Sequence, residues 1–225
     1  MTADPDRPVT RPTDPPAPSP GPRAERQRVL DVAARRFAAQ GWVRTTMAQL
    51  ADESGVDAAR IERLVGTKSE VFTAMVWRAI LGEHQGLQEA FDVLRLEEEP
   101  DVDARLDVLA RAVTAMVARM AHLVPAIAEA VARDATVRGI VQGAELQRVG
   151  STRRLVALLT RGDAARPDAV PEVQMLCSGE TYRSMTAFSW SEERYAAWLR
   201  QAFDLAVNGT GAVLVDRPAG PAARP

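Results

Sequence analysis

The polar side chains best suited to recognise another molecule lie in one short segment of the N-terminal third of the chain. Arg60, Glu62 and Arg63 fall within the segment Asp57–Val65, which follows a glycine at Gly55. Guanidinium groups bind phosphates and the edge of guanine, and a carboxylate accepts the amino group of cytosine. This combination favours contact with a nucleic acid over catalysis.

The sequence patterns of common enzyme active sites are missing. The chain has no glycine-rich phosphate loop, no His–Glu zinc motif and no GxSxG. Cys177 is the only cysteine, which excludes an intrachain disulfide and fits a reducing compartment. His84 and His122 have no neighbouring carboxylate motif. We therefore expect a protein that is not an enzyme, needs no cofactor and binds no metal.

The segment from residue 28 to residue 72 predicts three short helices and the start of a fourth. The first helix ends at Gly41, because a left-handed conformation costs glycine little. Thr45 or Thr46 supplies a hydroxyl that caps the second helix. The first helix has its apolar face at Leu30, Ala33, Ala34 and Phe37, and the second at Met47, Leu50 and Ala51.

The second and third helices are joined by a tight turn. Gly55 breaks the second helix, Val56 fills the corner, and Asp57 caps the third helix. The apolar residues of that third helix are Ile61, Leu64 and Val65. Two helices hinged by about four residues with glycine at the turn form a helix-turn-helix, whose second helix fits the major groove of DNA.

An ordered series of residues in this segment carries a family resemblance. The series is Ala33, Ala34, Phe37, Ala38, Gly41, Trp42, Thr45, Thr46, Leu50, Ala51, Gly55, Val56, Lys68 and Phe72. In these residues and their spacings the segment resembles the DNA-binding domain of the tetracycline-repressor (TetR) family of bacterial transcription regulators. The resemblance implies an all-α fold, with an N-terminal three-helix helix-turn-helix DNA-binding domain and a C-terminal helical ligand-binding and dimerisation domain.

The resemblance also assigns a role to Lys68, the only lysine in the chain. It implies that this lysine, at the start of the fourth helix, binds a phosphate, which suits a flexible ammonium at a helix N-terminus. For most of the chain's arginines the alternative to phosphate binding is a solvent-exposed position on a helix face with no bound partner. The residues that we expect nearest to DNA are Arg44, Thr45, Thr46, Arg60, Glu62, Arg63 and Lys68.

The chain departs from the family pattern in the third helix. Two tyrosines that would contact phosphate are replaced by Glu62 and Leu64. A carboxylate at a phosphate contact is repelled, so Glu62 either reads a cytosine amino group or turns away from the DNA backbone. The operator sequence and the strength of DNA binding are therefore left open.

Composition divides the chain into four parts. Residues 1–22 include eight prolines and predict a disordered arm, and residues 209–225 predict a flexible tail. Residues 23–70 form the helix-turn-helix domain, and residues 71–208 form the ligand-binding and dimerisation domain. Helices are expected at 68–96, 103–123, 127–134, 137–159, 172–188 and 192–207, with the main loop at 161–171.

If the fold is right, the middle helices enclose a mostly apolar pocket for a small-molecule effector. The candidate lining is Trp77, Phe91, Met116, Met120 and Tyr182, with His84 or His122 as polar groups. Plain core packing is the alternative, because methionines and aromatics at helical spacing are common in cores.

The resemblance implies that the last two long helices pair with those of a second copy. The last helix has a broad apolar stripe, part of which we expect to bury against the partner. The candidate dimer residues are Val173, Leu176, Cys177, Met185, Tyr195, Trp198, Leu199 and Phe203.

The overall charge and the hydropathy pattern bear on the partners and the location of the protein. The net charge is −2, so the chain as a whole is not basic. No signal-peptide core and no apolar stretch of membrane-spanning length is present, so a cytoplasmic location is expected. We expect a repressor that binds a near-palindromic DNA operator as a homodimer and is released by an apolar effector. The alternative is a TetR-like helical dimer with weakened or lost DNA binding, acting as a ligand- or protein-binding module.

Overall fold

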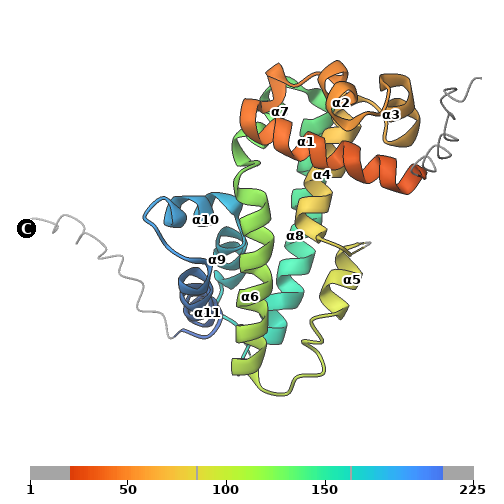
Figure 1. The fold of residues 1–225 in the computed structure, drawn as a ribbon. Coiled ribbons are helices and arrows are strands. Elements are labelled where there is room, and N and C mark those ends of the chain that lie inside the picture. Colours follow the sequence, from red (N-terminus) through yellow and green to blue (C-terminus); the bar gives the residue numbers. More distant parts are fainter. Residues whose placement is uncertain (1–20, 85, 163, 210–225) are drawn as a thin grey trace, which may run out of the picture.

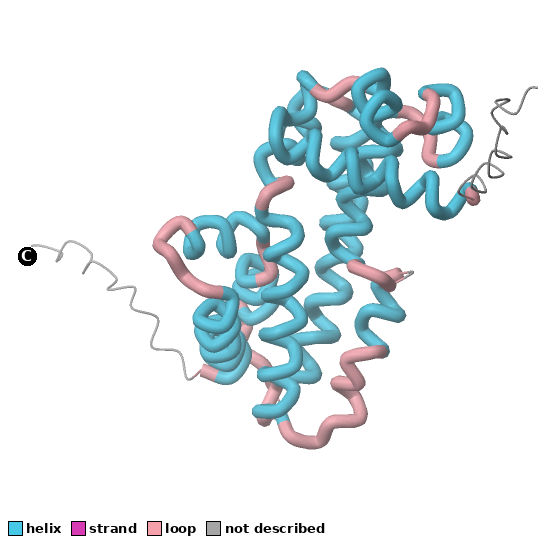
Figure 2. Tube along the Cα trace, viewed as in Figure 1, coloured by secondary structure: helices cyan, strands magenta, loops and turns pink. Residues whose placement is uncertain are grey.

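The computed structural model describes residues 21–84, 86–162 and 164–209. Figure 1 and Figure 2 show that these residues form helices joined by loops, with no strand among them. The predicted all-α class is thereby confirmed. The predicted disordered arm (residues 1–22) and flexible tail (residues 209–225) lie outside the described residues, apart from Gly21, Pro22 and Gly209, and Pro22 is the first residue of a helix.

Eleven helices make up the described part of the chain. They are α1 (Pro22–Arg44), α2 (Met47–Ser54), α3 (Ala58–Leu64), α4 (Lys68–Leu81), α5 (Leu87–Asp92), α6 (Val102–Ala121), α7 (Val124–Arg133), α8 (Ala135–Leu159), α9 (Ala169–Leu176), α10 (Gly179–Thr186) and α11 (Glu192–Asn208). In Figure 1, α1, α2 and α3 lie together at one end of the molecule, which we call the head. Helices α5, α6 and α8–α11 form the opposite part, the body, and α4 runs from one to the other.

The head has a core of its own that also takes in part of α7. Phe37, Trp42 and Phe72 form an aromatic cluster, with ring centroids 4.8 to 5.8 Å apart. Ala126 and Ala130 of α7 are buried in the same core. Edge-to-face aromatic contacts add to the hydrophobic burial of these large rings. Because α8 of the body also contributes the buried side chain of Val137 to this core, the head and the body share a packed boundary.

The helix ends follow local sequence signals closely. Thr46 and Thr67 each form a capping box, in which the hydroxyl accepts the amide hydrogen three residues on and the side chain there accepts the threonine's own amide. Asp57 and Ser191 cap α3 and α11 in the simpler one-sided way. The caps predicted at Thr46 and Asp57 are confirmed.

The predicted helix over residues 68–96 is wrong as a single element. Helix α4 ends at Leu81, because Gly82 adopts a positive φ of 65°. Arg119 of α6 donates from Nε to the carbonyl of Ala79 at 2.8 Å and from Nη2 to that of Ile80 at 3.3 Å. These long-range bonds occupy carbonyls that the end of the helix leaves unpaired.

The predicted helix over residues 172–188 is also divided. Helix α9 ends at Leu176, and Ser178 caps α10 by accepting the amide hydrogen of Thr181 at 3.1 Å. At Gly179, a Cβ atom would lie 3.0 Å from Val124. The absence of a side chain at Gly179 therefore lets α10 approach the start of α7 closely.

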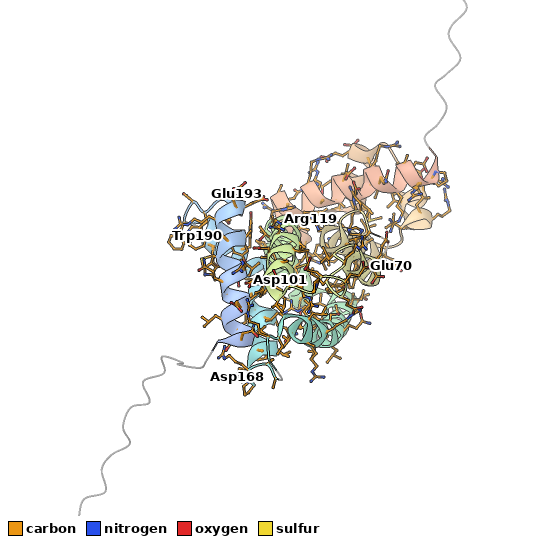
Figure 3. All side chains as sticks on the ribbon, turned by 90° about the horizontal axis from the view of Figure 1, so that it is seen from below. Glu70, Asp101, Arg119, Asp168, Trp190 and Glu193 are labelled. Atoms are coloured by element: carbon orange, nitrogen blue, oxygen red, sulfur yellow. The ribbon has the colours of Figure 1, made fainter. Side chains whose placement is uncertain are left out.

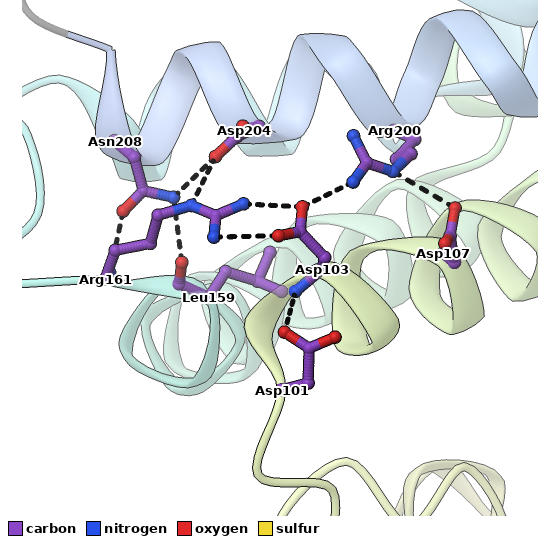
Figure 4. Close-up of polar contacts among 8 residues, drawn as sticks. All are labelled: Asp101, Asp103, Asp107, Leu159, Arg161, Arg200, Asp204 and Asn208. Atoms are coloured by element: carbon purple, nitrogen blue, oxygen red, sulfur yellow. Dashed lines mark hydrogen bonds and ion pairs between the residues drawn. The ribbon is translucent and has the colours of Figure 1, made fainter.

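A polar network joins three helices at the far end of the body (Figure 4). Arg161, just after α8, donates to both oxygens of Asp103 at 2.8 and 3.1 Å and to Asp204 of α11 at 3.2 Å. Arg200 of α11 contacts Asp103 at 2.5 Å and Asp107 at 3.1 Å. These arginines keep the pKa of Asp103 below its usual value. The network fixes the start of α6 against the end of α8 and against α11.

Among the described helices, none alone is long and apolar enough to cross a membrane. Helices α6 and α7 would pass such a test only together, and they are bent by 61° at the break between them.

Candidate nucleic-acid interface

Helices α2 and α3 form the predicted helix-turn-helix. Gly55 ends α2 in the left-handed conformation (φ 65°, ψ 24°), and the side chain of Val56 is buried in the corner. Asp57 accepts the amide hydrogen of Arg60 at 2.9 Å and so begins α3. Ile61 is fully buried in the head core and anchors α3.

One face of α3 is exposed. It consists of Ala58, Ala59, Glu62 and Arg63, all of which are exposed. Residues three and four apart lie on the same face of a helix, so these four form one continuous surface. Within the described part of the chain, the side chains of Glu62 and Arg63 have no ion pair or hydrogen bond. They are therefore free to contact another molecule.

Ala58 and Ala59 were not among the predicted site residues. Their position one helical turn before Glu62 and Arg63 could have predicted that they share the exposed face of the helix. Their small side chains let the helix approach a partner closely, and an alanine methyl can contact the methyl group of thymine.

Arg60 does not belong to this face. Its Nε and Nη2 atoms each lie 2.9 Å from Oε2 of Glu25 on α1. The guanidinium thus holds the first turn of α3 against α1. The prediction that Arg60 contacts base edges or phosphates is not met in this conformation, since its donors turn toward the protein.

The two threonines before α2 have different roles. Thr45 is fully buried, and its hydroxyl donates to the carbonyl of Gly41 at 2.9 Å. The prediction that Thr45 contacts DNA is therefore wrong. Thr46 is exposed at the N-terminus of α2, where amide groups favour a phosphate. Arg44 is also exposed, and its Nε donates to the carbonyl of Gln40 at 3.1 Å.

Lys68 is turned toward the protein. Its Nζ donates to the carbonyl of Trp42 at 2.7 Å and lies 4.2 Å from the centroid of the Trp42 ring. Burial lowers the pKa of Lys68, and the nearby carboxylates of Glu129 and Asp134 act in the opposite direction. Lys68 was expected to bind a phosphate, but in this conformation it does not point toward a position where it could do so, because it donates to the carbonyl of Trp42.

The residues predicted to line an effector pocket are spread over the body. Phe91, Met116 and Tyr182 pack against the body core, where the Tyr182 ring meets that of Tyr195. His84 lies 4.0 Å from Glu89, and His122 is exposed at the end of α6. Trp77 and Met120 are half-buried on α4 and α6.

The described surface includes two open grooves that bear on this prediction. One, of about 430 Å³, lies between α6 and the start of α11 and is lined by Arg111, Thr114 and Glu193 among others. The other, of about 200 Å³, lies beside α5 and is lined in part by Phe91. Phe91 is the one predicted pocket residue that lines either groove.

The structure divides the predicted dimer residues into two groups. Val173, Tyr195, Leu199 and Phe203 are fully buried in the core of their own chain. Placing these four in a dimer interface was wrong, because they have no surface left to bury. The others, Leu176, Cys177, Met185 and Trp198, are partly buried at the edge of that core. Fully apolar exposed side chains nearby are Met175, Phe188 and Leu205.

Comparison with solved structures relates this geometry to known proteins. A TetR-family transcriptional regulator from Streptomyces coelicolor superposes with a TM-score of 0.61 at 18% identity, over 82% of this chain and 94% of that one. A TetR transcription regulator from Haloarcula marismortui gives a TM-score of 0.57 at 12% identity, over 81% of this chain and 95% of that one. The repressor MexZ of Pseudomonas aeruginosa gives a TM-score of 0.53 at 20% identity, over 81% of this chain and 94% of that one.

No family model matches the chain, and no curated protein sequence matches it. The structural likeness extends over nearly the full length of each neighbour. At these identities it establishes the fold, which is the helical fold of TetR-family regulators.

Proposed function

We propose that this chain is a TetR-type transcription regulator, a repressor that binds a near-palindromic operator as a homodimer. The observation that carries the proposal is the exposed face of α3. Ala58, Ala59, Glu62 and Arg63 lie on a helix whose opposite side is anchored by Ile61. A helix that shows short and charged side chains on one face suits the major groove.

A second copy is needed because one such face reads only a few base pairs. Two heads related by a two-fold axis would engage successive turns of the duplex and demand a palindromic site. The exposed apolar side chains of Met175, Phe188 and Leu205 on or next to α9–α11 support this region as the dimer surface. Figure 3 shows Trp190 at the outer edge of the same region.

The proposed effector is a small apolar molecule that binds the body. A ligand lowers operator affinity only if it favours a state in which the two heads are wrongly spaced. The bonds from Arg119 of α6 to the end of α4 support this route, because α4 joins the body to the head.

A second candidate function is a ligand- or protein-binding module of the same shape with weakened DNA binding. The observation that favours it is the inward orientation of Arg60 and Lys68. Arg60 is paired with Glu25, and Lys68 donates to the carbonyl of Trp42, so in this conformation neither side chain is directed toward a phosphate.

A fluorescence-polarisation titration separates these functions. The probes are labelled duplexes from the DNA flanking the gene and a scrambled duplex of equal length. A regulator binds a flanking duplex more tightly than the scrambled one, with affinity that falls steeply as salt rises. Arg63→Ala should weaken this binding, and Arg153→Ala, which removes an exposed arginine of α8, should not. Absence of binding at low salt would favour the module.

A further inference from the structure

Glu129, on α7, binds the backbone of the head. Its Oε2 accepts the amide hydrogen of Trp42 at 2.6 Å and lies 3.4 Å from the amide nitrogen of Val43. Glu129 is separated from these residues by more than 80 positions in the sequence. Hydrogen bonds from amides to a carboxylate are stronger than those between neutral groups. One side chain of α7 therefore fixes the turn between the main part of α1 and α2.

Gly41 makes room for this carboxylate. The residue has a φ of 77° and a ψ of −176°, which interrupts the helical course of α1. A Cβ atom at this position would collide with Oε2 of Glu129. The glycine is thus required both by its backbone conformation and by the close approach of Glu129.

The same turn holds Lys68. The carbonyl of Trp42 accepts from Nζ of Lys68, while the amide of Trp42 donates to Glu129. One peptide segment therefore connects α7 to the first residue of α4. A second contact lies next to it, where Ser69 donates to Asp134, the N-cap of α8, at 2.9 Å.

We propose that Glu129 is a positioning residue for the DNA-reading head. By fixing the Gly41–Val43 turn it sets where Thr46 and α2 begin and where Lys68 is held. The inference rests on the proposed function and deepens it, since it names the side chain through which α7 orients the helix-turn-helix. A shift of α7 relative to the head would break these bonds and misplace the reading face.

The test compares full-length wild type with Glu129→Ala and Glu129→Gln. Asp52→Asn serves as the control, because it removes an exposed carboxylate of the head that has no side-chain partner among the described residues. The first readout is hydrogen exchange of a peptide spanning residues 41–45, measured by mass spectrometry. Loss of a charged hydrogen bond predicts exchange about tenfold faster in Glu129→Ala. Glu129→Gln, which keeps one oxygen acceptor, should recover most of the protection.

The second readout is the ratio of affinities for a duplex that the wild type selects from a random library and for a scrambled duplex. We expect this ratio to fall about tenfold in Glu129→Ala and to stay unchanged in Asp52→Asn. A residue that only stabilises the fold would lower the melting temperature without changing the ratio. That result, or unchanged exchange in residues 41–45, would overturn the proposal.

Glu129→Asp provides a second route if Glu129→Ala does not fold. The aspartate side chain is one methylene shorter, so it keeps the charge but should no longer bring its carboxylate to the amide of Trp42. Exchange in residues 41–45 should then be faster than in wild type, and unchanged exchange would contradict the contact. If wild type selects no duplex, the proposed function fails, and the exchange measurements still decide whether Glu129 positions the turn.

Discussion

Arg60 of α3 places its Nε and Nη2 atoms at 2.9 Å from a single oxygen of Glu25 on α1. Both side chains are partly buried, with 33% and 19% of their surfaces exposed. Together with the buried side chain of Ile61, the pair fixes which side of α3 faces outward. With Arg60 turned back to α1, Glu62 and Arg63 are left on the exposed side.

This pair should stabilise the head measurably. We expect Glu25→Ala and Arg60→Ala each to lower the free energy of unfolding by about 1 kcal/mol, since the pair is partly exposed to solvent. The double variant should lose less than the sum of the single losses. Urea denaturation followed by circular dichroism measures these values. Arg26→Ala, at an exposed arginine of α1, is the control, and strict additivity would show that the pair contributes nothing.

Arg63 should act on DNA and leave stability unchanged. Its side chain is exposed and has no partner among the described residues, so Arg63→Ala should change unfolding by less than about 0.5 kcal/mol. Loss of a base contact would cost about 1–3 kcal/mol and relax specificity at one position, whereas loss of a phosphate contact would reduce the salt slope by about 1. Titrations at several salt concentrations distinguish the two. If Arg63→Ala bound every duplex with the same affinity as the wild type, Arg63 would not be part of the DNA interface.

The capping box at Thr46 should matter for the start of α2. The hydroxyl accepts the amide hydrogen of Gln49 at 3.3 Å, and the Gln49 side chain accepts that of Thr46 at 3.0 Å. Thr46→Ala should destabilise the protein by about 1 kcal/mol, and Thr46→Ser should retain most of the stability. Thermal unfolding without DNA measures this. Similar melting temperatures for the alanine and serine variants would contradict a capping role.

Local signals predicted most helix starts in this fold. Thr46, Asp57, Thr67 and Ser191 are caps because their side chains bond to amides three residues on, which is a property of a few adjacent residues. The order of helices and the exposure of Glu62 and Arg63 follow from the same periodicity. These features required no knowledge of tertiary contacts.

The features that the sequence did not predict depend on distant partners. Helix α4 ends at Leu81 with carbonyls bound by Arg119, which is 39 and 40 positions away from its acceptors. Glu25 and Trp42 turn Arg60 and Lys68 inward, and neither partner is near them in sequence. The last helix was expected to have apolar surface to spare, but the core of its own chain takes up Tyr195 and Phe203.

The network around Asp103 should make stability depend on pH in the acid range. Hydrogen bonds from Arg161, with the two arginine charges, keep the pKa of Asp103 below its ordinary value of 3.8. A folded-state pKa that is lowered contributes stability above the unfolded value, and this contribution is lost as the pH falls through the folded pKa. Melting temperatures of wild type and Asp103→Asn should therefore differ at neutral pH and converge as the pH falls below 3.8 and through the lowered pKa of the folded state. A difference that persists unchanged in acid would contradict the assignment.

Cys177 should be unreactive in the folded protein. It packs against the body core, and burial raises the pKa of its thiol from 9.0 to about 12. The thiolate is the reactive form, so at pH 8 alkylation by iodoacetamide should be about 1000-fold slower than for a thiol of ordinary pKa. The same protein unfolded in guanidinium chloride should react at the ordinary rate.

The raised pKa of Cys177 also predicts how stability changes in alkali. The folded protein keeps the thiol proton while the unfolded chain loses it above pH 9.0, so the contribution to stability is complete below that pH and declines as the pH rises toward about 12. Cys177→Ala should remove this part of the decline, as measured by urea denaturation between pH 8 and pH 10. Rapid alkylation of the native protein at pH 8, or an identical alkaline decline in the variant, would show that the thiol is accessible and ionises normally.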